Sequence, residues 1–109
     1  MNRKVVILES AEHDLKELRG YITKRFSVES WQNSYEKIKK AIRNLQAFPN
    51  VGSIPEEIEE LNLGQYRQVL SGKNRIIYEV RQNTIFIHII VDTRRDFKSL
   101  LTKRLLRTI

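Results

Sequence analysis

Residues 66–96 constrain the fold more than any other part of this chain, because they contain three strand-like runs in close succession. In the first two runs, apolar and polar residues alternate with a period of two, which is typical of strands with one buried face. The third run, residues 85–91, is apolar apart from His88 and rich in β-branched residues, which predicts a central strand covered on both faces. Residues 71–74 and 82–83 supply turns, since Gly and Asn tolerate left-handed conformations. We therefore predict three neighbouring strands in chain order.

The N-terminal part of the chain predicts one further strand and two helices that cover this sheet. A short apolar run at residues 4–9 is interpreted as a strand of the same sheet. Ser10 is expected to cap a helix whose apolar stripe, at spacings of three and four, ends at Phe26. After a break at residues 27–30, a second stripe at residues 31–45 predicts another helix. Because the link is short, the two helices should pack as an antiparallel hairpin.

The remaining segments predict a loop and a last helix. Residues 49–63 lack periodicity and contain glycine, proline and an acidic cluster at residues 56–60, so we expect a loop with at most one helical turn. The glutamates are interpreted as solvated, because consecutive side chains diverge and no calcium-loop residues surround them. Thr93 and Asp96 resemble a capping box, and an amphipathic, basic helix is expected after them.

Together these elements predict an α+β fold in a single domain spanning residues 1–109. In this fold the N-terminal strand and the helical hairpin pack on a small, mainly antiparallel four-stranded sheet, with a C-terminal helix. A chain of 109 residues that is 40% hydrophobic can bury one modest core. No apolar run is long enough to span a membrane, and no leader like a signal peptide precedes Val5, so we expect a cytoplasmic protein without membrane contact.

The cysteine and histidine content argues against metal chemistry. The chain has no cysteine, so a disulfide and a thiolate site are both excluded. Its two histidines are far apart in sequence. His13 is interpreted as an ordinary exposed residue and His88 as a packed core residue. We expect no metal ion and no other cofactor.

The positive charge is distributed unevenly along the chain. Residues 1–60 contain ten basic and ten acidic side chains, whereas residues 61–109 contain ten basic and three acidic ones, so the second half carries the whole formal net charge of +7. This asymmetry favours an acidic partner, either nucleic acid or an acidic protein segment. A basic surface kept for solubility is the alternative. A second set of cations on the hairpin is interpreted as solvated charge that could also touch a partner: Lys37, Lys39, Lys40 and Arg43.

Two short motifs lie at the ends of adjacent predicted strands. They are R-x-x-Y, from Arg75 to Tyr78, and V-D-T-R-R-D, at residues 91–96. With these motifs and the order of elements over roughly residues 3–107, the chain resembles the RelE/ParE superfamily of bacterial toxin–antitoxin toxins. The resemblance implies a RelE/ParE-like fold and a toxin that is neutralised by a cognate antitoxin.

Two activities within that superfamily compete. Members similar to RelE are ribosome-dependent endoribonucleases that cut messenger RNA, and without a metal they need several basic groups and a side chain that moves a proton. Arg67, Arg75 and Arg94 could occupy the basic positions, but Val69 stands where a second lysine would be useful. No tyrosine or histidine follows His88, and an arginine is a poor proton shuttle because it stays protonated.

Members similar to ParE inhibit DNA gyrase as protein ligands, and this is the leading hypothesis. Many relatives have a histidine where this chain has Asp92, which argues further against acid–base chemistry. The residues expected to bind the target are Arg94, Arg95, Lys103, Arg104 and Arg107. A salt-bridge cluster that caps the last helix is the alternative role for residues 94–96. Replacing the last three basic residues of the chain by glutamine is expected to leave the melting temperature nearly unchanged.

The resemblance also implies partners. The cognate antitoxin is expected to be a small acidic or partly disordered protein, and its binding is assigned to Arg67, Arg75 and Tyr78. Operator DNA would be contacted only indirectly, through the antitoxin. A RelE-like endoribonuclease is the second hypothesis, and a toxin-like fold without activity is a third, because a fold does not fix a function.

Overall fold

The computed structural model describes residues 3–61, 63–93 and 97–106. Within these ranges the chain forms four strands, three α-helices and one 3-10 helix. In chain order they are β1 (Lys4–Ile7), α1 (Glu9–Arg25), α2 (Val28–Ala47), the 3-10 helix η1 (Glu56–Leu61), β2 (Tyr66–Ser71), β3 (Asn74–Arg81), β4 (Thr84–Asp92) and α3 (Phe97–Leu106). No helix in these ranges has the length and apolar content needed to cross a bilayer.

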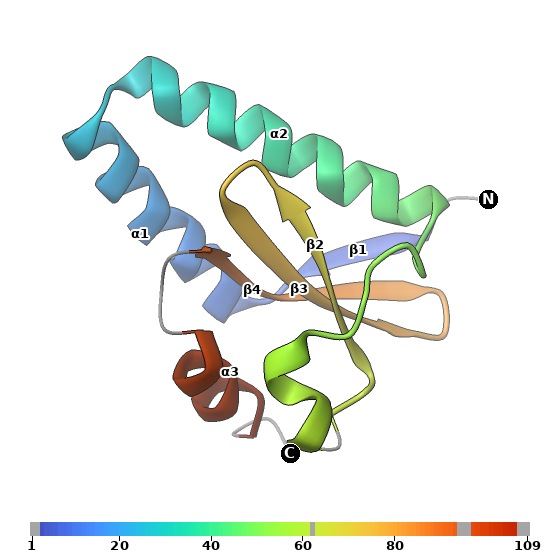
Figure 1. Cartoon of the computed structure of the whole chain (residues 1–109). Helices are drawn as coiled ribbons and strands as arrows, with labels where there is room; N and C mark the ends of the chain where they lie inside the picture. Colours follow the sequence, from blue (N-terminus) through green and yellow to red (C-terminus); the bar gives the residue numbers. More distant parts are fainter. Residues whose placement is uncertain (1–2, 62, 94–96, 107–109) are drawn as a thin grey trace.

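The four strands form one mixed sheet in the order β1-β4-β3-β2 (Figure 1). The strands β2, β3 and β4 are antiparallel neighbours, whereas β1 pairs in parallel with β4. The predicted α+β fold class and the chain order of the last three strands are therefore confirmed. Gly72 in the first turn has a φ of 60°, and in the second turn the left-handed residue is Gln82, with a φ of 55°, although Asn83 is its neighbour.

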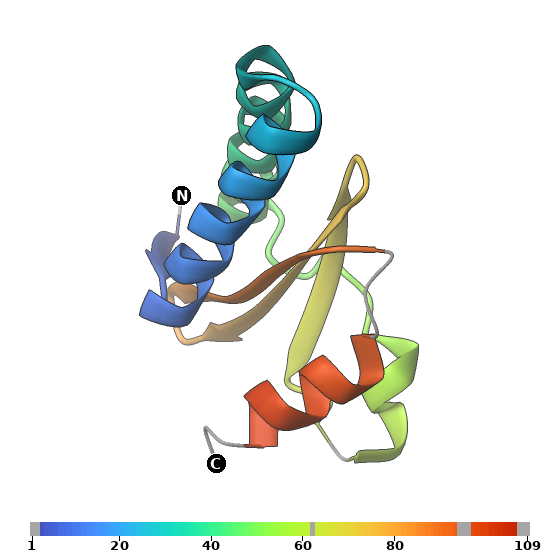
Figure 2. The same cartoon turned by 90° about the vertical axis from the view of Figure 1, so that its left-hand side faces the viewer.

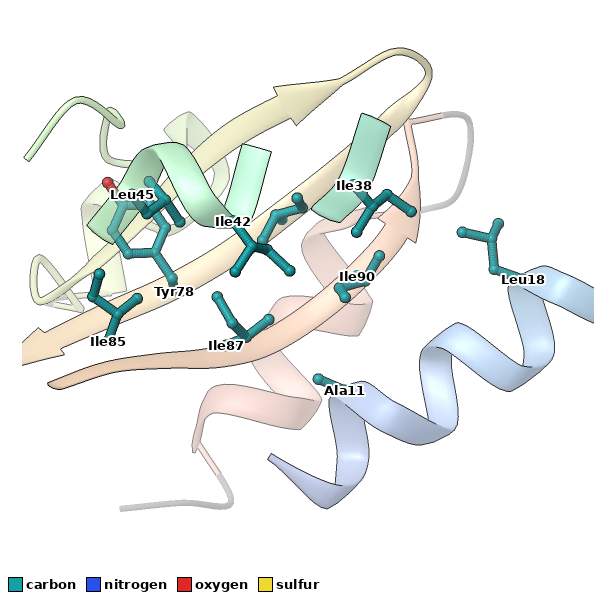
Figure 3. Close-up of a cluster of buried hydrophobic side chains, with 10 residues drawn as sticks. Ala11, Leu18, Ile38, Ile42, Leu45, Tyr78, Ile85, Ile87 and Ile90 are labelled. Carbon is teal, nitrogen blue, oxygen red and sulfur yellow. The ribbon is translucent and has the colours of Figure 1, made fainter. Parts of the chain in front are cut away.

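The helices are divided between the two faces of the sheet (Figure 2). The α1–α2 hairpin covers one face, and α3 and η1 lie on the other. On the hairpin side, buried side chains from the helices and the sheet form one cluster, most of which Figure 3 labels: Ala11, Leu18, Ile38, Ile42, Leu45, Ile76, Tyr78, Ile85, Ile87 and Ile90. The second cluster contains Ile58, Leu63, Tyr66, Ile77, Ile89, Val91 and Leu101. Both faces of β3 are therefore buried, and the prediction of a single buried face for this strand was wrong.

The predicted start of the first helix was also wrong. The helix α1 begins at Glu9, its N-cap residue is Leu8, and no side chain caps it. The reason is that the backbone N–H of Leu8 still donates to the carbonyl of Ile87 in β4 (3.1 Å), while its own carbonyl already accepts from Ala11 and Glu12. The chain therefore turns directly from sheet to helix, without room for a separate capping residue.

The link between the two helices is shorter than predicted. The helix α2 begins at Val28, because the Ser27 Oγ accepts from the backbone N–H of Ser30 (3.0 Å) and so caps it. Phe26 is 65% exposed, so the expectation that it extends the buried stripe was wrong. The 3-10 helix η1 has six residues, more than the single turn predicted, and it places Ile58 in the core. The proposed capping box involves Asp96, which lies outside the described residues.

Candidate functional site

The loop between α2 and β2 is fixed to the sheet by Tyr78. The Tyr78 hydroxyl donates to the carbonyl of Pro49 (2.7 Å) and accepts from the backbone N–H of Gly52 (3.0 Å). Arg67 of β2 adds a hydrogen bond from its guanidinium to the Gly52 carbonyl (2.8 Å). Burial raises the pKa of Tyr78, so its hydroxyl stays protonated at neutral pH and can act as this donor. Tyr78 is completely buried, so its side chain is a structural anchor for the loop.

Arg75 of β3 makes a second, charged attachment to the same loop. Its guanidinium lies 2.9 Å from the Oε2 of Glu57 in η1 and donates to the Oε1 of Gln68 (3.3 Å). The two paired side chains are 20% and 25% exposed, so this ion pair is partly shielded from water. The prediction that the acidic cluster is solvated was therefore wrong for Glu57, whose side chain turns inward to Arg75.

The helix α3 is attached to α1 and to β4 through Arg104. Its guanidinium donates to both carboxylate oxygens of Asp14 in α1, at 3.0 and 3.2 Å, and to the carbonyl of His88 (2.8 Å). The same carboxylate accepts from the backbone N–H of Ile90 (3.1 Å). Asp14 thus joins α1, β4 and α3 at one point. The side chains of Arg104 and Asp14 are 22% and 15% exposed.

A second polar group is buried within the sheet. The Nε2 of His88 lies 2.9 Å from the Oε1 of Glu79, and the imidazole packs edge-on against the ring of Tyr66 at 5.0 Å between centroids. Arg81 approaches the other carboxylate oxygen of Glu79 at 3.3 Å. Burial lowers the pKa of His88, although the Glu79 carboxylate acts in the opposite direction. His88 is buried, which confirms its interpretation as a core residue.

A groove lies beside the Asp14–Arg104 pair, between α1, the end of β4 and α3. It has a volume of about 1140 Å³. Apolar side chains line it together with polar and charged ones: Leu8, Glu9, Ser10, His13, Asp14, Glu17, Leu18, Tyr21, Ile90, Val91, Asp92, Leu100 and Arg104. His13 is exposed on this rim, as predicted. Such a lining can accept a protein segment with apolar and basic side chains, but it offers no metal site, since no three ligands cluster among the described residues.

The family of the chain follows from its sequence match. The model of the ParE toxin of the type II toxin–antitoxin system parDE matches residues 5–97. This chain belongs to the ParE toxin family. It is thus a type II toxin of the RelE/ParE superfamily, as the resemblance implied. A search of curated protein sequences gave no match.

Solved structures with the same fold include toxins of both branches. A chain of the chromosomal ParDE system from P. aeruginosa has a TM-score of 0.69 at 16% identity, covering 83% of this chain and 95% of that one. A free mutant of the E. coli toxin RelE has a TM-score of 0.68 at 12% identity, with both chains fully covered. A chain of the toxin–antitoxin complex RelBE2 from Mycobacterium tuberculosis has a TM-score of 0.57 at 18% identity, covering 84% and 99%. These likenesses confirm the RelE/ParE-like fold.

The structure separates the predicted site residues of this ParE-family toxin into two groups. Arg67 and Arg75 attach the same loop to the sheet, next to Tyr78. On α3, Lys103 is exposed, whereas Arg104 is held by Asp14 and the His88 carbonyl. Arg94, Arg95 and Arg107 lie outside the described residues. Because Arg104 joins three elements, it is not the free surface charge that the glutamine prediction assumed, and we now expect its replacement to lower the melting temperature.

The sequence contained a signal for only part of this geometry. Asp14 lies three residues after Ala11 and four before Leu18, so its position on the stripe that faces the sheet could have been found. Glu79 similarly alternates with Ile77 on one face of β3. The pairing of Glu57 with Arg75 had no such signal, because the four glutamates of the cluster are equivalent in sequence.

Proposed function

We propose that this ParE-family toxin inhibits DNA gyrase by protein–protein binding and that a cognate antitoxin neutralises it. The observation that carries the proposal is the state of the arginines on the sheet. Arg67 is bonded to the Gly52 carbonyl and Arg75 to the Glu57 carboxylate. A metal-independent nuclease needs cations that are open to phosphate, and here both are already engaged by the protein. Their geometry therefore favours the binding protein over the RelE-like endoribonuclease.

The lack of an accessible tyrosine or histidine on the described sheet supports the same choice. The tyrosines and histidine of β2, β3 and β4 are Tyr66, Tyr78 and His88, and each is at most 6% exposed. Tyr78 uses its hydroxyl for the loop, and His88 faces Glu79. A general acid or base must come within hydrogen-bond reach of its substrate, which these buried groups cannot do without rearrangement.

For the gyrase contact we propose the basic end of the chain. On α3, Lys103 presents an exposed charge, and Arg94, Arg95 and Arg107 are assigned to the same contact from sequence. Arg104 contributes to this contact only through its partly exposed guanidinium, since Asp14 and the His88 carbonyl already hold it.

For the antitoxin we propose an acidic, partly disordered segment that approaches Arg67 and Arg75. Because both arginines are already engaged within the protein, the segment would bind them by displacing Glu57 from Arg75 and the Gly52 carbonyl from Arg67, and the rest of an extended antitoxin interface would offset that cost. We keep this assignment for the two arginines alone, because the buried Tyr78 offers no surface. Operator DNA would be bound through the antitoxin. Two of the similar structures come from a ParDE toxin–antitoxin system and from the toxin–antitoxin complex RelBE2, which supports an antitoxin partner here.

Two assays on the purified toxin test the proposed target. We expect inhibition of gyrase supercoiling, or accumulation of the gyrase cleavage complex, while messenger RNA on translating ribosomes stays intact. Replacing Lys103 and Arg107 by glutamine should weaken the gyrase effect about tenfold, as loss of contact residues at an interface does. Lys98→Gln is the matched control, because Lys98 is an exposed lysine on the same helix outside the proposed contact. Ribosome-dependent cleavage with unaffected gyrase would establish the RelE-like alternative.

A further inference from the structure

We propose that a groove between α2 and the edge strand β2 binds an extended, acidic segment of a partner protein. The groove has a volume of about 1010 Å³. Its basic lining residues are Lys37, Lys40 and Arg43, and no acidic side chain is among the described residues that line it. It lies away from α3, so this inference does not depend on whether the toxin acts on gyrase. Figure 1 shows α2 running past the β2–β3 hairpin.

The cations of this groove are available to a ligand. Lys37, Lys40 and Arg43 are exposed, and within the described part of the chain none of them forms an ion pair. The neighbouring Lys39 differs, because it pairs with Glu36 at 2.7 Å. Three unpaired positive groups along one rim of a groove raise the local potential and favour carboxylates in whatever binds there.

A buried hydroxyl in the groove also lacks a partner. Ser71, at the end of β2, is only 6% exposed, and its Oγ has no hydrogen-bond partner among the described residues. Leaving such a group unpaired is unfavourable, so it marks a place where a ligand acceptor would be stabilised. Lys37 is close by, because a Cβ added at Gly72 would lie 3.9 Å from its Cδ. The Ser71 Oγ is itself covered, so a ligand carboxylate accepts from it once the side chain turns toward the groove, where the same carboxylate would face the Lys37 ammonium.

The backbone of β2 indicates that the ligand is an extended peptide. Gln68 exchanges both backbone hydrogen bonds with Ser53, at 3.1 and 2.7 Å, on the side away from β3. By the alternation of an antiparallel ladder, the N–H and C=O of Leu70 point to that same open edge. The loop leaves this edge before it reaches Leu70, since the Val51 N–H bonds instead to the Phe48 carbonyl (3.2 Å). An added segment can take the place beside Leu70 and extend the sheet.

The apolar rim of the groove favours a peptide over single-stranded nucleic acid. Val51 and Leu70 are 57% and 64% exposed and can cover apolar side chains that alternate with the acidic ones. No aromatic side chain is among the described residues of the lining, whereas single-stranded nucleic acid is generally held by bases stacked on aromatic rings.

The test measures binding of a short, labelled peptide of alternating valine and glutamate to the full-length toxin by fluorescence anisotropy. Ser71→Ala should weaken binding about tenfold, because it removes a charge-assisted hydrogen bond to the ligand. It should not lower the stability of the free protein, because the hydroxyl is unpaired when no ligand is bound. Lys37→Gln combined with Lys40→Gln should also weaken binding about tenfold and reduce its salt dependence. Methylating the peptide's amide nitrogens should weaken it as well, because the edge bonds are then blocked.

The matched control is the pair Lys16→Gln and Lys24→Gln, two exposed lysines of α1 that do not line the groove. It removes the same charge and should change the affinity less than about twofold, as distant surface substitutions do. Absence of peptide binding would overturn the proposal, as would an equal loss in the control pair or unchanged affinity in Ser71→Ala. The proposal would also be overturned if an oligothymidine probe bound more tightly than the peptide and lost affinity when Lys37 and Lys40 were replaced by glutamine.

Discussion

Replacing Arg104 by glutamine should loosen the attachment of α3 to the rest of the toxin. The substitution removes two hydrogen bonds to Asp14, at 3.0 and 3.2 Å, and one to the His88 carbonyl, at 2.8 Å. It also leaves the Asp14 carboxylate, whose side chain is 15% exposed, with the Ile90 N–H as its remaining hydrogen bond from these elements.

The size of the effect follows from how exposed the pair is. Breaking a fully buried ion pair costs about 3–5 kcal/mol, whereas an exposed pair contributes about 0–1 kcal/mol. Because the Arg104 and Asp14 side chains are 22% and 15% exposed, we expect Arg104→Gln to lower the free energy of unfolding by about 2 kcal/mol. For a domain of this size, that loss corresponds to a melting temperature lower by about 8–16 °C.

Urea unfolding followed by far-ultraviolet circular dichroism measures this loss directly. Lys103→Gln is the control, because this exposed neighbour should change the free energy of unfolding by less than about 0.5 kcal/mol. A double-mutant cycle of Arg104→Gln with Asp14→Ala should give a coupling energy of about 1 kcal/mol or more. An Arg104→Gln protein as stable as the Lys103→Gln protein, or strictly additive losses in the cycle, would refute a structural role for this pair.

Three further predictions concern the loop attachment and the buried histidine. Tyr78→Phe should lower the free energy of unfolding by about 1–3 kcal/mol in urea, because it leaves two buried backbone groups of the loop unpaired. Gly52→Ala should destabilise by a similar 1–3 kcal/mol or so in the same assay, since the new Cβ would lie 2.6 Å from both the Gln68 carbonyl oxygen and the Tyr78 hydroxyl. Burial lowers the pKa of His88 from its ordinary value of 6.5, so at a pH just below 6.5 the unfolded chain binds more protons than the folded protein. The free energy of unfolding should therefore fall as the pH drops below 6.5. His88→Gln should show a shallower fall between neutral and acidic pH, and identical pH profiles would contradict this.

The strands were predictable because their signal is local. The runs that form β2, β3 and β4 can be recognised from their alternation, their β-branched residues and their turn residues, all of which lie within a few positions of one another. The capping of α2 was less predictable, since Ser27 and Ser30 are both acceptable caps by composition. In the structure α1 ends at Arg25, and Ser27 rather than Ser30 is the N-cap residue of α2.

The contacts that organise the candidate sites were not predictable, because they join residues far apart in sequence. Asp14 and Arg104 are 90 positions apart, and Glu57 and Arg75 are 18 apart. The position of Asp14 on the apolar stripe of α1 could be found from sequence, but nothing near any of these four residues indicates its partner. Their pairing depends on how α3 and η1 lie on the second sheet face, and periodicity within a single strand contains no information about which element will cover it.

The count of charges along the sequence did not indicate which basic side chains are available to a partner. The second half of the chain carries the whole net charge of +7, yet three of its arginines are bound within the protein. Arg67 donates to a backbone carbonyl, Arg75 pairs with a carboxylate, and Arg104 binds one group of each kind. The first half is neutral overall, but its acidic residues are placed so that none lines the α2–β2 groove among the described residues, and its cations there remain unpaired. The two kinds of cation should therefore respond differently to substitution: loss of Arg75 or Arg104 should appear first as lower stability, whereas loss of Lys37 and Lys40 should appear as weaker, less salt-dependent binding in an equally stable protein.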